Sequence, residues 1–186
     1  LWSSFDFGVA NGEYVSALTF SPLDPQKAWA VTDRGRIYHS SDRGVSWTQS
    51  TSNGPGPQYF YGTALLASRT EPGTVYVGGT GYSGASIWRS TDGGVTFQPF
   101  AQGLPPTLVY CLGESRDGLG TLFCGTETSA YRRDQGAGGW VDITDTHAPL
   151  TIYWSVETLP HENTMRFGTY GRGIWDYRLA PKIRRR

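Results

Sequence analysis

Two stretches of the chain, SSDRGVSWTQ at residues 40–49 and STDGGVTFQP at residues 90–99, repeat the same four residue types at identical spacing. Each has a Ser, then an Asp two positions later, a Gly two positions after that, and a Trp or Phe three positions further on. Asp carboxylates readily accept hydrogen bonds from nearby backbone N–H groups, and Gly permits a positive φ. The pattern therefore predicts a tight turn followed by an aromatic side chain that packs between neighbouring elements.

The residues expected to build these two turns are Ser40, Asp42, Gly44, Trp47, Ser90, Asp92, Gly94 and Phe97. A third copy, in which Asp134 and Gly136 are followed by Trp140, is degenerate. A calcium-binding loop or a catalytic Asp would also place an Asp in a Gly-containing loop. The repeated aromatic residue favours a structural turn over both alternatives.

Each turn closes a longer unit, and four copies of that unit run over residues 14–49, 61–100, 108–144 and 153–179. A repeat period in the forties with four predicted strands per unit is typical of a β-propeller blade. The sequence therefore predicts an all-β fold of four four-stranded antiparallel sheets, with blades at about 14–50, 59–100, 108–144 and 153–179 of a propeller segment that spans residues 1–179. The predicted second strands align as Trp29-Ala30-Val31, Tyr76-Val77-Gly78, Phe123-Cys124-Gly125 and Arg166-Phe167-Gly168.

The turn motif resembles the Asp box, or BNR repeat, of sialidases, sortilin-type receptors and xyloglucanase-like enzymes of the glycoside hydrolase family 74 type. The closing stretch GTYGRGIWDY at residues 168–177 looks like the last blade of the sortilin and xyloglucanase-like propellers. The resemblance covers nearly the whole chain. It implies that the box is a structural turn on the side away from the ligand face, and that the protein acts outside the cytoplasm, extracellularly or in the periplasm.

The number of blades leaves three alternatives open, because the resembled families use six or more. The chain is part of a ring of six to eight blades, pairs with a second copy, or closes alone as four blades. The fourth unit lacks an outer strand, which residues 1–7 (LWSSFDF) are expected to supply, with Trp2 placed like Trp47. The stretch 180–186 (APKIRRR) is expected to be a basic tail or linker.

Composition excludes several classes of function. Sixteen Lys and Arg balance sixteen Asp and Glu, so no net field attracts nucleic acid, and no apolar run approaches the length of about 20 residues that a membrane span needs. The three histidines lack partners at metal-binding spacing, so we expect no metal and no cofactor. Cys111 and Cys124 are expected directly opposite each other on a hairpin, which leaves open a disulfide or two buried thiols.

Chemistry is expected on the face opposite the Asp-containing turns, where loops carry many aromatic residues. Aromatic side chains with scattered polar groups suit stacking on sugars or burial of a partner's side chains, and about half of them are expected to pack inside the propeller instead. The expected ligand-binding residues are Tyr59, Tyr61, Tyr82, Trp154, Tyr170 and Arg172. The candidate catalytic carboxylates are Asp33, Glu127 and Asp145.

Two hypotheses about function follow. The first is a noncatalytic binding or scaffold segment that recognises a protein or a glycan on this face. The alternative is part of a secreted xyloglucanase-like polysaccharide hydrolase, which would need two carboxyl groups about 5 to 9.5 Å apart. Further expected partners are the remainder of a propeller or a second copy of the chain, with no nucleic acid and no membrane span.

Overall fold

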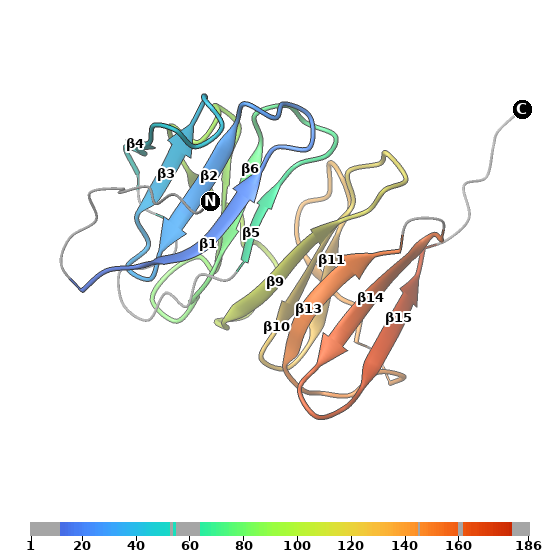
Figure 1. Ribbon diagram of the computed structural model, residues 1–186. Coiled ribbons are helices and arrows are strands. Elements are labelled where there is room, and N and C mark those ends of the chain that lie inside the picture. Colours follow the sequence, from blue (N-terminus) through green and yellow to red (C-terminus); the bar gives the residue numbers. More distant parts are fainter. Residues whose placement is uncertain (1–11, 53, 55–63, 145, 160–161, 180–186) are drawn as a thin grey trace, which may run out of the picture.

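The computed structural model describes residues 12–52, 54, 64–144, 146–159 and 162–179. All the regular structure in these residues is β-strand, in four antiparallel sheets that follow one another along the chain (Figure 1). Each sheet is a meander, because its strands pair in sequence order. The all-β propeller-blade prediction is confirmed, and we number the sheets as blades 1 to 4.

The strands of each blade have the following bounds. Blade 1 holds β1 (Val15–Phe20), β2 (Ala28–Thr32), β3 (Ile37–Ser40) and β4 (Thr48–Gln49). Blade 2 holds β5 (Ala64–Ala67), β6 (Val75–Gly78), β7 (Ile87–Ser90) and β8 (Gln98–Pro99). Blade 3 holds β9 (Val109–Glu114), β10 (Leu122–Thr126), β11 (Ala130–Arg133) and β12 (Val141–Asp142). Blade 4 holds β13 (Tyr153–Thr158), β14 (Thr164–Thr169) and β15 (Ile174–Arg178).

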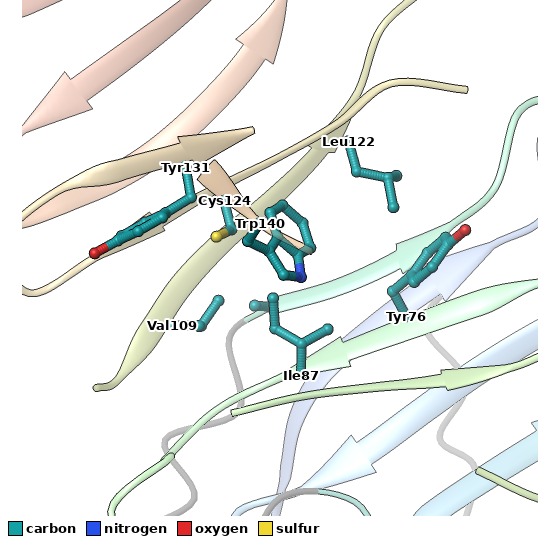
Figure 2. Close-up of a cluster of buried hydrophobic side chains, with 8 residues drawn as sticks. Tyr76, Ile87, Val109, Leu122, Cys124, Tyr131 and Trp140 are labelled. Atoms are coloured by element: carbon teal, nitrogen blue, oxygen red, sulfur yellow. The ribbon is translucent and has the colours of Figure 1, made fainter. Parts of the chain in front are cut away.

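Apolar side chains hold the blades together face to face. The first strands β1, β5, β9 and β13 lie next to one another in turn, and one buried cluster fills the space between each pair of consecutive blades. The middle strand β10 is buried along its whole length, because its two faces serve two clusters: Cys124 faces blade 2 and Phe123 faces blade 4. Figure 2 shows the cluster between blades 2 and 3, where Ile87 lies among Val109, Cys124 and Trp140.

Glycines in the second strands allow neighbouring blades to approach closely. A Cβ atom on Gly125 would lie 2.3 Å from the carbonyl oxygen of Tyr153, and one on Gly78 would lie 2.7 Å from a methyl group of Val109. No side chain fits at such distances. The Gly that ends the aligned second-strand triplets therefore has a packing role at blades 2 and 3.

The cysteine prediction is wrong by one position in the register. Cys111 pairs with Gly125, and Cys124 pairs with Leu112, so the two side chains lie on opposite faces of blade 3. Opposed cysteines would need the hairpin to turn at Asp117 and Gly118, but its loop is longer and is closed by the bond from the Ser115 N–H to the Thr121 carbonyl. Both cysteines are free and buried, and burial raises the pKa of each thiol.

Blade 4 has three strands among the described residues, as its sequence predicts. The expected outer strand 1–7 and the expected tail 180–186 lie outside the described residues. The β15 strand pairs with β14 on one side only within the part of the chain that the structure describes.

Candidate functional site

The meander topology separates two ends of the blades. The turns between third and fourth strands, which hold Asp42 and Asp92, lie at the same end as the turns between first and second strands, and we call this end the turn face. The turns between second and third strands and the segments that join blades lie at the other end, which we call the loop face.

Asp42 and Asp92 are each held by hydrogen bonds inside their own turns. Asp42 accepts from the Ser46 N–H at 2.8 Å, the Ser46 hydroxyl at 2.5 Å and the Ser40 hydroxyl at 2.7 Å. Asp92 accepts from the Thr96 N–H at 3.0 Å, the Thr96 hydroxyl at 2.5 Å and the Ser90 hydroxyl at 2.7 Å. Both carboxylates are bonded within their own turns, as a structural turn requires.

These contacts change the acidity of both groups. The hydroxyl and N–H of Ser46, with the Ser40 hydroxyl, lower the pKa of Asp42 to about 2. Burial raises the pKa of Asp92, but the hydrogen bonds from Thr96 and Ser90 outweigh it and lower that pKa to about 2. Each carboxylate is therefore charged over the whole ordinary pH range.

The other residues of the two turns complete the same structure. Gly44 and Gly94 have φ values of 83° and 95°, and each donates its N–H to the Ser that opens its turn. Phe97 is buried between blades 1 and 2, whereas the indole N–H of Trp47 bonds back to the Gly44 carbonyl within the turn.

Asp33 and Glu127 occupy equivalent places on the loop face, in blades 1 and 3. The Asp33 carboxylate accepts the N–H of Tyr14 at 3.0 Å, and the Glu127 carboxylate accepts the N–H of Leu108 at 2.8 Å. In both blades the acid thus fixes the chain just before the first strand. No contact joins the two carboxylates among the described residues, and Asp145 lies outside those residues.

Glu127 makes one contact that Asp33 does not make, to an expected binding residue. Tyr82, from the loop between β6 and β7 of the neighbouring blade, donates its hydroxyl to Glu127. This hydrogen bond, with a smaller effect of burial, raises the pKa of Tyr82 to about 12. The Tyr82 ring stays 61% exposed, so the bond orients an aromatic surface that remains accessible.

A stacked aromatic pair completes the cluster. Trp154 on β13 stacks on Tyr110 on β9, with ring centroids 5.1 Å apart and planes 26° apart. Tyr110 lies two residues beyond Leu108, whose N–H the Glu127 carboxylate accepts, and burial and the charge of Glu127 raise the pKa of Tyr110. Trp154 is 57% exposed. We call Tyr82, Tyr110, Glu127 and Trp154 the aromatic cluster of the loop face.

The remaining expected binding residues lie apart from the cluster. Tyr170 and Arg172 occupy the β14–β15 turn, where both are exposed and show no contact with the cluster within the described ranges. Tyr59 and Tyr61 lie outside the described residues.

Sequence reasoning missed Tyr110 and Glu13. Tyr110 lies between the buried residues Val109 and Cys111 on β9. This alternation could have indicated that its side chain lies on the less buried face of the strand. Glu13 is buried, accepts the Thr32 hydroxyl and pairs with Arg36 at 3.1 Å. Nothing in its local sequence indicates that contact.

No group of three or more acidic, His or Cys side chains that could hold a metal ion occurs among the described residues. The same residues include no helix with the length and apolar character that crossing a membrane requires.

Comparison with known proteins places the chain among β-propeller proteins. No protein-family profile matches it. A xyloglucanase from Hypocrea jecorina (strain QM6a) is 30% identical in an alignment of 114 residues that covers 52% of this chain and 13% of that protein. The GH74 enzyme of Niastella koreensis has a TM-score of 0.65 at 20% identity, over 81% of this chain and 24% of that chain.

Two further solved structures have the same fold without a glycosidase name. The extracellular domain of the B. thetaiotaomicron protein BT4673 has a TM-score of 0.68 at 17% identity, over 94% of this chain and 22% of that chain. The protein YCF48 bound to D1 peptide has a TM-score of 0.61 at 17% identity, over 90% of this chain and 52% of that chain. At these identities the structural likeness establishes the fold alone. The chain is therefore a set of propeller blades that spans a small part of its xyloglucanase-type relatives.

Proposed function

We propose that this chain is a noncatalytic binding segment of a β-propeller, and that its aromatic cluster binds a polysaccharide. The observation that carries the proposal is the stack of Trp154 on Tyr110, in which Trp154 remains 57% exposed. A flat apolar surface next to a hydrogen-bond acceptor suits the two faces of a sugar ring, one apolar and one rich in hydroxyls.

The cluster suits binding better than hydrolysis, because its single carboxylate is already engaged. Glu127 accepts from the Leu108 N–H and from Tyr82, so it is held in one orientation. A preorganised acceptor costs little ordering when a hydroxyl binds to it. The similarity to a xyloglucanase makes a xyloglucan-type β-glucan the first ligand to test.

The test is calorimetric titration with xyloglucan oligosaccharides. We expect Trp154→Ala to weaken binding about tenfold or more, since truncation of an aromatic anchor costs about 2 kcal/mol. Tyr82→Phe should weaken it less, because only the hydroxyl is lost. Val141→Ala, which truncates an exposed residue on β12, is the control and should bind like the wild type. Equal binding by the Trp154 variant would contradict the proposal, as would binding of proteins but of no glycan.

A second function, part of a secreted polysaccharide hydrolase, is favoured by the sequence similarity to a xyloglucanase. Such an enzyme needs a general acid and a second carboxylate flanking the scissile bond. Asp33 and Glu127 each fix a backbone N–H in separate blades, so Asp145 is the remaining candidate from the sequence. Release of reducing ends from xyloglucan that is abolished by Asp145→Asn, at unchanged binding, would favour this function over the first.

The Asp-containing turns of blades 1 and 2 support assignment as Asp boxes, and the relatives that carry extracellular names support a place outside the cytoplasm. We also propose that an added strand completes blade 4 along β15. The free edge of β15 is the kind of edge that proteins usually cover. Residues 1–7, those of a second copy, or the remainder of a larger ring would supply the strand.

A further inference from the structure

A pocket of about 320 Å³ opens on the turn face between blades 2 and 3. Residues of the β5–β6 turn of blade 2 and of the β9–β10 and β11–β12 turns of blade 3 line it, with Phe100 and Leu122 as its apolar wall. Two arginines, Arg89 on β7 and Arg133 at the end of β11, line it. The pocket is at the opposite end of the blades from the aromatic cluster, so it is separate from the proposed glycan site.

Both arginines contact one aromatic ring. The guanidinium carbon of Arg133 lies 4.0 Å from the centroid of Phe100, and that of Arg89 lies 4.7 Å from the same centroid. Burial, with the positive charge of Arg89, lowers the pKa of Arg133. The two positive charges therefore act on each other, and each also makes a cation–π contact with Phe100.

The guanidinium of Arg133 has an unused donor. Its Nη2 donates to the Ala137 carbonyl at 3.0 Å, while its Nη1 is buried without a hydrogen-bond partner among the described residues. Neither Arg89 nor Arg133 forms an ion pair within the part of the chain that the structure describes. Buried polar groups in proteins are nearly always hydrogen-bonded, so Arg133 is held in the pocket wall with one donor unsatisfied.

The acidic groups near the pocket already have other donors. Glu71 accepts from the Gln135 amide at 3.1 Å, and Asp134 pairs with Arg132 at 2.7 Å. Glu114, whose charge reaches Tyr76, accepts the Arg69 N–H at 2.6 Å and belongs to a separate buried network. Of the two carboxylates that line the pocket, Asp134 is paired with Arg132 and Glu71 forms no ion pair among the described residues, so two unpaired arginines face one unpaired carboxylate.

Comparison of the blades shows that Arg133 replaces a structural residue. In the register of each blade, Ser40 pairs with Ala28, Ser90 with Val75 and Arg133 with Leu122, the first residue of the second strand in each case. The two serines close Asp-containing turns through their hydroxyls. Blade 3 lacks the serine hydroxyl at this position and has a guanidinium in a pocket instead. This exchange is unexpected for a residue with only a structural role.

We propose that this pocket binds a small monovalent carboxylate, which the guanidinium groups of Arg89 and Arg133 hold together. A carboxylate matches the planar fork of a guanidinium and reduces the repulsion between the two cations. Its short apolar tail would rest against Leu122 and Phe100. A single negative charge suits the site better than two, because Glu71 and Asp134 also line the pocket.

The experiment is an NMR titration of the ¹⁵N-labelled protein with sodium propionate, compared with sodium chloride at equal ionic strength. We expect saturable shifts at the backbone amides of Gly120, Gln135 and Gly136, which line the pocket. Arg133→Ser installs the residue that blades 1 and 2 carry at this position, so the fold should tolerate it. We expect propionate to bind this variant and Arg89→Gln about tenfold more weakly or worse.

Arg116→Gln is the matched control, because Arg116 is an exposed arginine on the same face that does not line the pocket. It should bind propionate like the wild type. A parallel titration with sodium sulfate tests the charge of the ligand and should give weaker binding. Absence of saturable shifts, equal affinity in the Arg133 and control variants, or sulfate binding more tightly than propionate would overturn the proposal.

Discussion

Blades 2 and 4 carry side chains at equivalent register positions on the face that points away from the preceding blade. These side chains are buried in blade 2, whereas in blade 4 they are exposed. In blade 2, Tyr76 and Ile87 are buried against blade 3 (Figure 2). The equivalent residues of blade 4 are Arg166, which forms an exposed ion pair with Asp176 at 2.7 Å, and Ile174, which is 71% exposed. Blade 4 thus keeps the strand pattern of the repeat, but the face that it turns away from blade 3 is exposed rather than buried.

The aromatic residue after the third strand shows the same contrast. Phe97 of blade 2 is buried between blades 1 and 2, and Trp140 of blade 3 is buried between blades 2 and 3. Blade 4 supplies no such residue among the described residues. Between blades 3 and 4, a pocket of about 460 Å³ lies beside Phe167, Trp175 and Tyr177 instead. The pocket matches the aromatic position of the other blades, which supports the proposal that an added strand completes blade 4.

The largest expected effect comes from truncating the equivalent isoleucines of blades 2 and 4, Ile87 and Ile174. Ile87→Ala removes buried methyl groups and leaves a cavity, which should cost about 2–5 kcal/mol of unfolding free energy. Ile174→Ala should change it by no more than about 0.5 kcal/mol, because the side chain is exposed. Urea unfolding of both variants measures the difference.

A large loss in the Ile174 variant would mean that this face is covered in solution, and would break the contrast between the blades. Repeating both measurements over a range of protein concentrations separates a second copy from a segment of the same chain. A concentration-dependent loss would indicate a second copy.

Most of the fold could be predicted from the sequence, because the residue patterns of the turns and strands recur in several blades. The repeated Ser, Asp, Gly and aromatic residues located the turns, and the alternating apolar residues located the strands. The cysteine register could not be predicted, since loop length decides it: a hairpin that closes at Ser115 and Thr121 shifts the pairing of Cys111 by one residue. Each one-residue shift moves a side chain to the other face of its sheet.

The next effect concerns the turns themselves. Asp92→Ala removes the acceptor of the Thr96 and Val95 N–H groups and should cost about 1–3 kcal/mol of unfolding free energy. Asp134→Ala in the degenerate turn removes an exposed ion pair with Arg132 and should cost about 1 kcal/mol or less. Thermal melts of the two variants compare them directly. Equal losses would contradict a special structural role for the intact turn.

The candidate site was less predictable than the fold. Tyr82, Glu127 and Trp154 were identified from the aromatic and acidic residues of the loops, and the structure brings Tyr82 to Glu127 across two blades. Tyr110 was missed because it lies within a strand, and its contact with Trp154 depends on how β9 and β13 pack. Sequence patterns describe one blade at a time, whereas this cluster exists only between blades.

The smallest expected effect is a difference between Asp92 of blade 2 and Asp176 of blade 4 in how their contributions to stability depend on pH and salt. Hydrogen bonds from Thr96 and Ser90 hold the pKa of Asp92 at about 2, and the Arg166 hydrogen bond and charge lower that of Asp176. A carboxyl whose pKa is lower when folded stabilises the protein above its unfolded pKa, near 4, and loses that contribution as the pH falls toward its folded pKa. Stability should therefore fall between about pH 4 and pH 2.

Melting temperatures of the wild type, Asp92→Asn and Asp176→Asn from pH 6 to pH 2 measure both contributions. Each variant should show a shallower acid loss than the wild type, since the substituted residue no longer takes up a proton. In about 1 M salt the difference between the wild type and Asp176→Asn should shrink, because a screening length of about 3 Å weakens an exposed ion pair. Asp92→Asn should stay distinct, because short hydrogen bonds inside a turn are screened much less. Convergence of both variants with the wild type would mean that the Asp92 turn is held by charge alone.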